Sequence, residues 1–479
     1  MRAPAIALRI PSGSAALAGL AASGGLLVLL LAGVAFGLAA PLALLGAGLA
    51  LALLQYPGTV VLVAVAAVVV CEGPSFGLFP QTANLYRDVV KGVMPLDGLI
   101  ALATAALAVQ LVTERRPLRM PPPLLALSLA FVALAVAAGL VVGRAHGVGT
   151  ASGLLAVHVV GYLLLIPLLI VNLRVDARQA QRVLGGAFAL AVAKALVGLV
   201  AVGLGRGETI DGESALTYYE PTANWLISVA LLSVAAGVVL KLRPPRRVLA
   251  TAPLLLLALV LSYRRSFWIG DAAALVMVFV LALTTSRRRA VLPIVAVLAG
   301  GAWLLGSVTV QSDTPLAERV RSLSPTQVVT KPADRYRLDE RANVIAEIRR
   351  APLTGRGIKV PWRATERMLP VEVSPAHEYV HFASLWWWLH MGLLGLIAYI
   401  MLLVSGTAMS WRVYRRARAP MVRAFGLGSL CSMVALLLIE TTATFTGVDA
   451  RFTVLFAAQL GLLAVLVRLT DRRRRYAAR

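Results

Sequence analysis

The chain has 479 residues, 59% of them hydrophobic and 14% charged, and carries a formal net charge of +24 at pH 7. Soluble domains are about 45–50% apolar, whereas this chain repeats apolar runs of about twenty residues, long enough to cross a hydrocarbon core of about 30 Å. The composition excludes a soluble globular protein, and the continuous runs exclude a membrane β-barrel, whose spans alternate polar and apolar residues over about ten positions.

The apolar runs predict an all-α, polytopic transmembrane helical bundle of 12–14 spans. Two runs, 57–71 and 249–263, are short enough for half-helices or re-entrant segments, so the expected number of crossings is a range. The fourteen runs are 13–34, 38–55, 57–71, 94–113, 122–142, 152–172, 182–203, 223–241, 249–263, 266–285, 290–309, 382–406, 421–440 and 451–469.

Clusters of lysine and arginine between the runs predict the topology. If the N-terminus is cytoplasmic, the clusters all fall on the cytoplasmic side, as the positive-inside rule requires. Both termini are then cytoplasmic, and the net charge reflects membrane orientation, with no nucleic acid expected as a partner. The clusters are Arg115, Arg116 and Arg119; Arg174, Arg178 and Arg182; Lys241, Arg243, Arg246 and Arg247; Arg287, Arg288 and Arg289; Arg412, Arg415, Arg416 and Arg418; and Arg472 to Arg475.

One large polar loop separates the eleventh and twelfth runs. We therefore divide the chain into N-terminal transmembrane helices (1–310), an extracytoplasmic loop (311–381), and C-terminal transmembrane helices with a basic cytoplasmic tail (382–479). Within the loop, helical spacing predicts an amphipathic helix at about 334–350 that lies on the membrane surface or caps a cavity. Asp334 is its expected N-cap. Its apolar face is expected at Leu338, Arg341, Ala342, Ile345 and Ile348.

Arg264 and Arg265 are the exception to the charge pattern, because they fall at an outer membrane boundary. An arginine at bilayer depth costs about 2.5–3.5 kcal/mol on insertion scales. Either these side chains extend to the outer headgroups, or the segment 249–285 crosses the membrane only once, or the pair binds a phosphate group. The fork of the guanidinium group suits phosphate well.

Two of the five histidines, His377 and His381, lie where the loop returns to the membrane. Their i, i+4 spacing places them on one face of a helix. One interpretation is a pair of solvated residues at a helix entry. A metal site is a second, although a third ligand and the His-Glu-x-x-His pattern are lacking. A general base or a phosphate-binding group is the third.

His381 also begins a spaced motif, in which Phe382, nine further residues and Gly392-Leu-Leu-Gly395 follow. Three other stretches precede it: Glu220-Pro-Thr-Ala-Asn224-Trp, Ser262-Tyr-Arg-Arg265-Ser-Phe-Trp, and the stretch from Arg335 to Pro352-Leu-Thr-Gly-Arg-Gly357. In this order, over about 205–400, they resemble the O-antigen ligase and O-antigen polymerase superfamily. That family's motif is a histidine, usually a small polar residue, nine residues and Gly-x-x-Gly, so Phe382 departs from it.

The resemblance implies an enzyme that transfers a glycan from a polyprenyl-diphosphate carrier to an acceptor glycan or glycolipid, at the outer face of the bacterial cytoplasmic membrane. Arginines would hold the leaving diphosphate, and a histidine would act on the acceptor hydroxyl. The motif spacing favours His381 for this role, and the Pro-Ala-His-Glu-Tyr context favours His377. The diphosphate-binding candidates are Arg265 and Arg264, with Arg335, Arg341 and Arg206 for a second position.

The expected partners are the lipid-linked donor, the acceptor and membrane lipids. No metal or other cofactor is expected, since arginines replace the divalent cation and the sequence has no Asp-x-Asp. A lipid-linked glycan flippase or transporter without bond-forming chemistry is the main alternative. Transporters place charges near the midplane and often show internal repeats, and neither pattern stands out here. A peptidoglycan glycan-strand polymerase is a further alternative.

Overall fold

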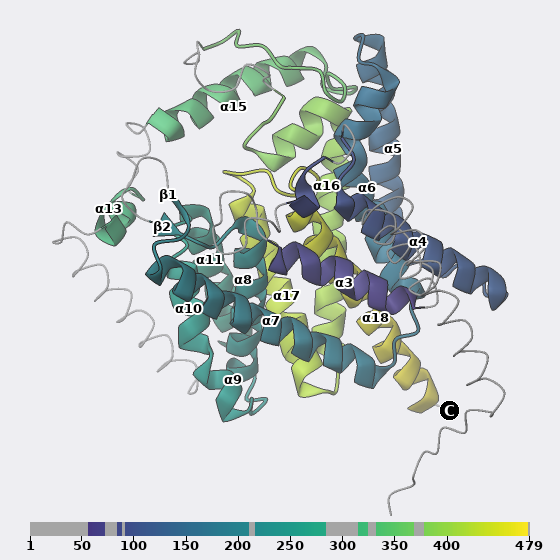
Figure 1. Cartoon of the computed structure of the whole chain (residues 1–479), viewed down its shortest axis with the longest axis vertical. Coiled ribbons are helices and arrows are strands. Elements are labelled where there is room, and N and C mark those ends of the chain that lie inside the picture. The colour runs from purple at the N-terminus through teal and green to yellow at the C-terminus, as the bar shows by residue number, and fades with distance from the viewer. Residues whose placement is uncertain are drawn as a thin grey trace, which may run out of the picture.

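The computed structural model describes residues 56–71, 84–88, 92–209, 216–283, 315–323, 332–367 and 378–477. These residues form a helical bundle with one short antiparallel hairpin, in which β1 (Glu208–Thr209) pairs with β2 (Leu216–Thr217) (Figure 1). The all-α prediction is confirmed. The predicted runs 13–34, 38–55 and 290–309 lie outside the described residues.

Fourteen helices are described. They are α3 (Pro57–Val70), α4 (Pro95–Thr113), α5 (Pro123–Ala145), α6 (Thr150–Asn172), α7 (Ala177–Gly203), α8 (Pro221–Val239), α9 (Arg246–Ala250), α10 (Ala252–Val260), α11 (Arg265–Leu283), α13 (Pro315–Arg321), α15 (Pro332–Arg350), α16 (Ala383–Arg416), α17 (Pro420–Ile439) and α18 (Ala450–Ala477). Among the described residues, eight helices are long and apolar enough to span a membrane: α4 to α8, α16, α17 and the Ala450–Asp471 part of α18. A polytopic membrane bundle is confirmed.

Local sequence explains where many of these helices begin. Proline occupies the first helical position of α4, α5, α8 and α17, where its missing N–H leaves no hydrogen bond unmade. A capping box opens α7: Asp176 accepts a hydrogen bond from the backbone N–H of Gln179 at 2.7 Å, and the Gln179 side chain accepts one from the Asp176 backbone at 2.9 Å.

Helices α8, α17 and α18 form the centre of the bundle, since most of their residues are buried. Helix α8 packs on α17, α16 packs on α5 and α17, and α18 packs on α6. Trp225 of α8 lies against Phe452 and Phe456 of α18 and donates its indole N–H to Gln459 at 3.0 Å. The buried indole N–H is therefore satisfied by a hydrogen bond, as is usual for a buried tryptophan.

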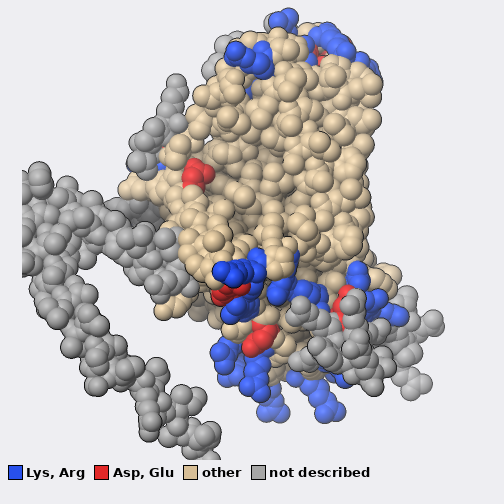
Figure 2. Space-filling model, turned by 90° about the vertical axis from the view of Figure 1, so that its right-hand side faces the viewer, with Lys and Arg blue, Asp and Glu red and all other residues tan. Residues whose placement is uncertain are grey.

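One end of the bundle, which we call the basic end, gathers several of the predicted cytoplasmic clusters. Arg174 pairs with Glu114, and Arg412 and Arg416 both pair with Asp471 at 2.8 and 2.6 Å. Figure 2 shows basic side chains at both ends of the molecule, with a broad surface of little charge between them. Arg468 of α18 donates to the carbonyl of Val171 near the end of α6 at 2.8 Å, so the ends of α6, α16 and α18 lie together. The cluster 287–289 lies outside the described residues.

Helix α15 lies across the opposite end of the bundle, at the top of Figure 1. We call this the α15 end. Helix α16 connects the two ends, because it starts beside α15 and ends at Arg416. The turn between α10 and α11 and the connection between α17 and α18 also lie at the α15 end, through contacts given below.

The predicted face of this helix is wrong at two of its five positions, Leu338, which is 39% exposed, and Arg341, which is also exposed. Ile348 is buried as predicted, and Ala342 and Ile345 are half-buried. Glu340, Asn343 and Glu347, which were not predicted, are buried as well. Each buried carboxylate has a cationic or imidazole partner outside the helix, so polar pairing, and not apolar spacing, decides which side is buried. Because α15 begins at Pro332, Asp334 lies inside the first turn and is not the N-cap.

Backbone hydrogen bonds join the loop after α15 to a kink in α16, and we call this contact the junction. Gly392 has φ +66° and ψ −162°, a conformation outside the helical region. The backbone N–H of Leu393 donates to Leu353 at 3.1 Å, and Leu389 accepts from the N–H of Arg356 at 2.6 Å. The helical bond from residue 393 to residue 389 is thus replaced by two bonds to the loop, which keeps the kinked backbone satisfied.

Glycine is required on both sides of this junction. A Cβ added at Gly392 would lie 2.1 Å from the carbonyl oxygen of Leu353, and one at Gly355 would lie 2.6 Å from that of Leu389. Both glycines also have positive φ. The loop then continues along α5, where Ile358 donates to the carbonyl of Gly139 at 3.0 Å. The junction therefore joins α5, α15 and α16.

We expect Gly392→Ala to lower the stability of the purified protein by at least the about 1–3 kcal/mol of a strained backbone, because the clash with Leu353 adds to it. Thermal unfolding in detergent measures the effect. Gly185→Ala on α7 is the matched control: its Cβ would meet open space, and alanine favours a helix. If Gly392→Ala melts at the same temperature as Gly185→Ala, the junction is not a stability determinant.

Candidate functional site

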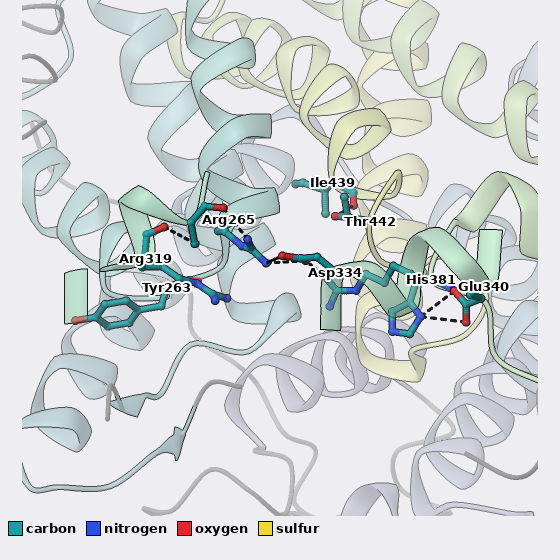
Figure 3. A network of polar contacts seen from close by, with 10 residues as sticks. Tyr263, Arg265, Arg319, Asp334, Glu340, His381, Ile439 and Thr442 are labelled. Atoms are coloured by element: carbon teal, nitrogen blue, oxygen red, sulfur yellow. Dashed lines mark hydrogen bonds and ion pairs between the residues drawn. The ribbon is translucent and has the colours of Figure 1, made fainter. Parts of the chain in front are cut away.

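Arg265 lies at the first residue of α11 and is held by α15. Its Nη2 donates to both carboxylate oxygens of Asp334, each at 2.8 Å, and its Nη1 donates to the backbone carbonyl of Ser322 at 2.9 Å (Figure 3). The side chains of Arg265 and Asp334 are only 13% and 8% exposed. A charge-assisted pair in such surroundings is shielded from salt, and either partner alone would be a largely buried charge.

Arg264 lies in the turn before α11 and points to other partners. Its Nε donates to the carbonyl of Tyr219 at 3.3 Å. Burial raises the pKa of Asp449, and the charge of Arg264 opposes that shift. Arg319 of α13 donates to the carbonyl of Tyr263 at 2.7 Å. The turn, whose residue Tyr263 has φ +51°, is thus fixed from two sides.

His381 is held by the same helix that holds Arg265. Glu340 of α15 accepts the backbone N–H of His381 at 2.9 Å, and its two oxygens lie 3.2 and 3.0 Å from Nδ1 of the imidazole. Glu340 is 1% exposed, whereas the His381 side chain is 24% exposed. The rings of Tyr379 and Tyr336 meet the imidazole edge-on, at centroid distances of 4.8 and 5.9 Å.

Tyr379 is not a second base at this position. Its pKa is raised to about 12, chiefly by burial around the hydroxyl, although 37% of the whole residue stays exposed. Its hydroxyl accepts the backbone N–H of Thr444 at 3.2 Å, in the connection between α17 and α18. Tyr379 therefore stays protonated near neutral pH and restrains the imidazole by its ring.

The Arg265 and His381 groups are separated by a length that α15 fixes. Their partners, Asp334 and Glu340, are six residues apart on one helix. A helix rises 1.5 Å per residue, so the two attachment points lie about 9 Å apart along its axis. Figure 3 shows the arginine, the two carboxylates and the histidine along this helix. The cation of Arg265 and the imidazole of His381 are thus attached to one helix within two turns of each other.

The other predicted arginines are distributed around this pair. Arg335 and Arg341 are exposed on α15, and the guanidinium of Arg341 lies 5.7 Å from the centre of the Phe382 ring, next to His381. Arg206 is exposed after α7, just before the β1–β2 hairpin that leads to α8. The predicted His377 lies outside the described residues. The structure therefore brings Arg265, Arg341 and His381 to one helix, with Arg335 on its surface.

A second buried ion pair at the α15 end was missed from the sequence. Arg451, at the start of α18, pairs with Glu220, immediately before α8, and the two side chains are 14% and 1% exposed. The guanidinium also lies 5.1 Å from the centre of the Tyr86 ring. The sequence contained a sign of this pair, because Arg451 begins an apolar run in the same way as Arg265.

The end of α15 carries a further buried acid. Glu347 is 1% exposed and forms ion pairs with Arg356 at 3.1 Å and with Arg350 at 2.6 Å. Arg356 belongs to the junction with α16, so this pair connects the helix to the Gly392 kink. Among the described residues, no group of three His, Cys, Asp or Glu side chains could hold a metal ion.

We expect Asp334→Ala to destabilise the α15 end, because Arg265 would lose its buried counter-charge. Breaking one side of a buried pair costs about 3–5 kcal/mol. Hydrogen exchange of α15, followed by mass spectrometry, should rise in this variant. Asp339→Ala is the control on the same helix: its partner, Arg367, is 61% exposed, so the loss is about 0–1 kcal/mol. Equal exchange in both variants would contradict the structural role of the Arg265 pair.

The comparison with known protein families agrees with the geometry. Residues 249–400 match the model of the O-antigen ligase family, a range that contains α10, α11, α13, α15 and the first half of α16. No curated protein is similar enough to the chain to count as a match. The match includes Arg265, His381 and Gly392, and it confirms the resemblance predicted from their motifs. Over residues 249–400, this polytopic membrane protein is similar to the O-antigen ligase family.

Proposed function

We propose that the protein is a glycosyltransferase that moves a glycan from a polyprenyl-diphosphate carrier to a hydroxyl group of an acceptor glycan or glycolipid. The observation that carries the proposal is the attachment of Arg265 and His381 to one helix, about 9 Å apart along its axis. A cation for a leaving diphosphate and a base for an attacking hydroxyl are thereby held by the same helix. The family match supports a transferase of the ligase or polymerase type.

The proposed step is a single displacement. The acceptor oxygen bonds to the anomeric carbon as the bond from that carbon to the diphosphate oxygen breaks, and the configuration inverts. Nε2 of His381 takes the hydroxyl proton, which later passes to water, and the polyprenyl diphosphate leaves as the anion. The guanidinium of Arg265 stabilises the negative charge that develops on the leaving oxygen. We expect no divalent metal to be needed, because arginine supplies this charge.

In the structure, Arg265 is already paired with Asp334. The donor diphosphate must therefore compete with this carboxylate. A diphosphate carries more charge than one carboxylate, and further arginines can share it. Arg264, Arg335, Arg341 and Arg206 remain the proposed additional contacts, and Arg337, whose Nη1 lies 3.4 Å from Asp334, is a further cation beside the pair.

We place the reaction at the outer face of the bacterial cytoplasmic membrane, with both termini cytoplasmic. The support is the separation of the two ends: the basic end carries several of the arginine clusters, and the α15 end carries Arg265 and His381. Under the positive-inside rule the basic end is cytoplasmic, so the α15 end faces outward, where lipid-linked glycans are used.

A flippase is the second candidate, because the bundle contains a large apolar cavity away from α15. Its volume is about 1410 Å³, and α3, α7, α8, α17 and α18 line it. Arg182, Arg243 and Arg247 contribute to its lining, so it reaches the basic end. Such a cavity could hold a lipid during movement, whereas the paired groups on α15 serve bond-forming chemistry better.

The direct test uses the purified protein in liposomes with a polyprenyl-diphosphate-linked oligosaccharide and an acceptor glycan. We expect Arg265→Ala and His381→Ala to lower transfer by about 10²-fold or more, the range for a lost charge-stabilising group or general base. Transfer should persist with EDTA. The controls are Arg415→Ala, next to Trp411 on α16, and His146→Ala, an exposed histidine after α5. Movement of the lipid-linked glycan without a new glycosidic bond would identify a flippase instead.

Cysteine labelling in intact cells tests the orientation. In a chain whose Cys71 and Cys431 have been replaced by alanine, we expect Thr365→Cys, exposed near α15, to react with a membrane-impermeant maleimide. Arg246→Cys, exposed at the start of α9, should react only after the cells are permeabilised. The reverse pattern would overturn both the topology and the outward-facing site.

A further inference from the structure

Glu340 has a narrower role than the other acids of α15. Among the described residues, all of its hydrogen bonds go to His381: one oxygen accepts the backbone N–H, and both oxygens lie within 3.2 Å of Nδ1. No arginine or lysine of the described residues pairs with it, in contrast to Asp334 and Glu347. Burial of a carboxylate that is 1% exposed is unfavourable unless a partner compensates the lost hydration. Among the described residues, His381 is the partner that forms hydrogen bonds with Glu340.

The carboxylate also decides which nitrogen of the imidazole carries the proton. A deprotonated carboxylate only accepts hydrogen bonds, so Nδ1 must be the donor. In the neutral ring the lone pair is then on Nε2, and Nε2 has no partner among the described residues. The histidine side chain is 24% exposed while Glu340 is closed off, which leaves the imidazole as the accessible member of the pair.

Two tyrosines restrict the ring from its sides. Tyr379 meets the imidazole at an interplanar angle of 86° and Tyr336 at 81°. Rotation of the ring by half a turn would take Nδ1 away from Glu340 and would place a carbon against the carboxylate. The bond from Glu340 to the backbone N–H of His381 fixes the start of the side chain as well. One acid and two rings thus restrain the position and the direction of the imidazole.

We propose that Glu340 is a positioning residue, which holds His381 in the Nδ1–H tautomer so that Nε2 faces the acceptor hydroxyl as the base. This inference rests on the proposed transferase function. During the step, the hydroxyl proton moves to Nε2, Nδ1 keeps its own proton, and Glu340 keeps its hydrogen bonds to His381. The carboxylate then faces the imidazolium that forms and stabilises its charge. When Nε2 releases the proton to water, the starting state returns.

The first test is spectroscopic and needs no substrate. The five histidines of the chain are labelled with ¹⁵N in the ring, and solid-state NMR of the protein in liposomes reports the tautomer of each. The signal absent from His381→Ala assigns the residue. We expect the Nδ1–H form in the unsubstituted protein and an added Nε2–H population in Glu340→Gln. A pure Nδ1–H form that persists in Glu340→Gln would overturn the proposal.

The second test is kinetic and separates positioning from general loss of structure. We expect Glu340→Gln to lower kcat by about 10–100-fold, the range for groups that orient a functional ligand or base, with the KM for the lipid-linked donor unchanged. Glu340→Asp should recover part of the loss. Glu347→Gln is the matched control, equally buried on the same helix but paired with Arg356 and Arg350; it should change thermal stability without changing the His381 tautomer.

The two proposals fail in different ways. If His381→Ala retains full transfer, the histidine is not the base and the proposed mechanism falls. If His381→Ala is inactive while Glu340→Gln keeps both its kcat and the Nδ1–H tautomer, the transferase mechanism stands and the positioning role of Glu340 is refuted. A change of the His381 tautomer in Glu347→Gln would also contradict the proposal, because it would show that any buried acid of α15 has the same effect.

Discussion

Burial of the acidic face of α15 is the constraint on which the α15 end depends. A carboxylate moved out of water costs several kcal/mol unless a partner compensates it. The three least exposed acids of this helix each have a partner from another element. The pairs are Asp334 with Arg265 of α11, Glu340 with His381 before α16, and Glu347 with Arg356 of the junction. Helix α15 therefore has a stable position only where all three partners meet it.

This arrangement couples the two halves of the proposed site. An anion that binds Arg265 must draw it from Asp334, and the same rigid helix carries the partner of His381 six residues further on. A shift at the first turn of α15 is opposed at its last turn, because Glu347 and the Gly392 junction fix that end. In the proposed mechanism, an anion that replaces Asp334 at Arg265 would therefore act on the same helix that holds His381.

Sequence patterns gave the helical bundle, because long apolar runs and charge clusters are local signals. They also drew attention to Arg265 and His381, each unusual for its place at a membrane boundary, whose roles in a site stay a prediction. The partners were not predictable in this way, since Asp334 is 69 residues from Arg265 and Glu340 is 41 residues from His381. The face of α15 was wrong at Leu338 and Arg341 for the same reason: apolar spacing does not show that distant partners bury the acids of this helix. Arg451 was missed because it was counted only as the start of a span.

The fixed spacing between His381 and Gly392 has a geometric cause. The segment that contains α16 meets the segment that contains α15 at two points. His381, just before α16, contacts Glu340, and the kink at Gly392 is hydrogen-bonded to the loop that follows α15. Gly392 lies ten residues after Phe382, about 15 Å along α16 at 1.5 Å per residue. One extra residue in this stretch would move His381 by about 1.5 Å and turn it by about 100° relative to the kink, away from Glu340. The contact of His381 with Glu340 and the contact at the kink therefore restrict the number of residues between them.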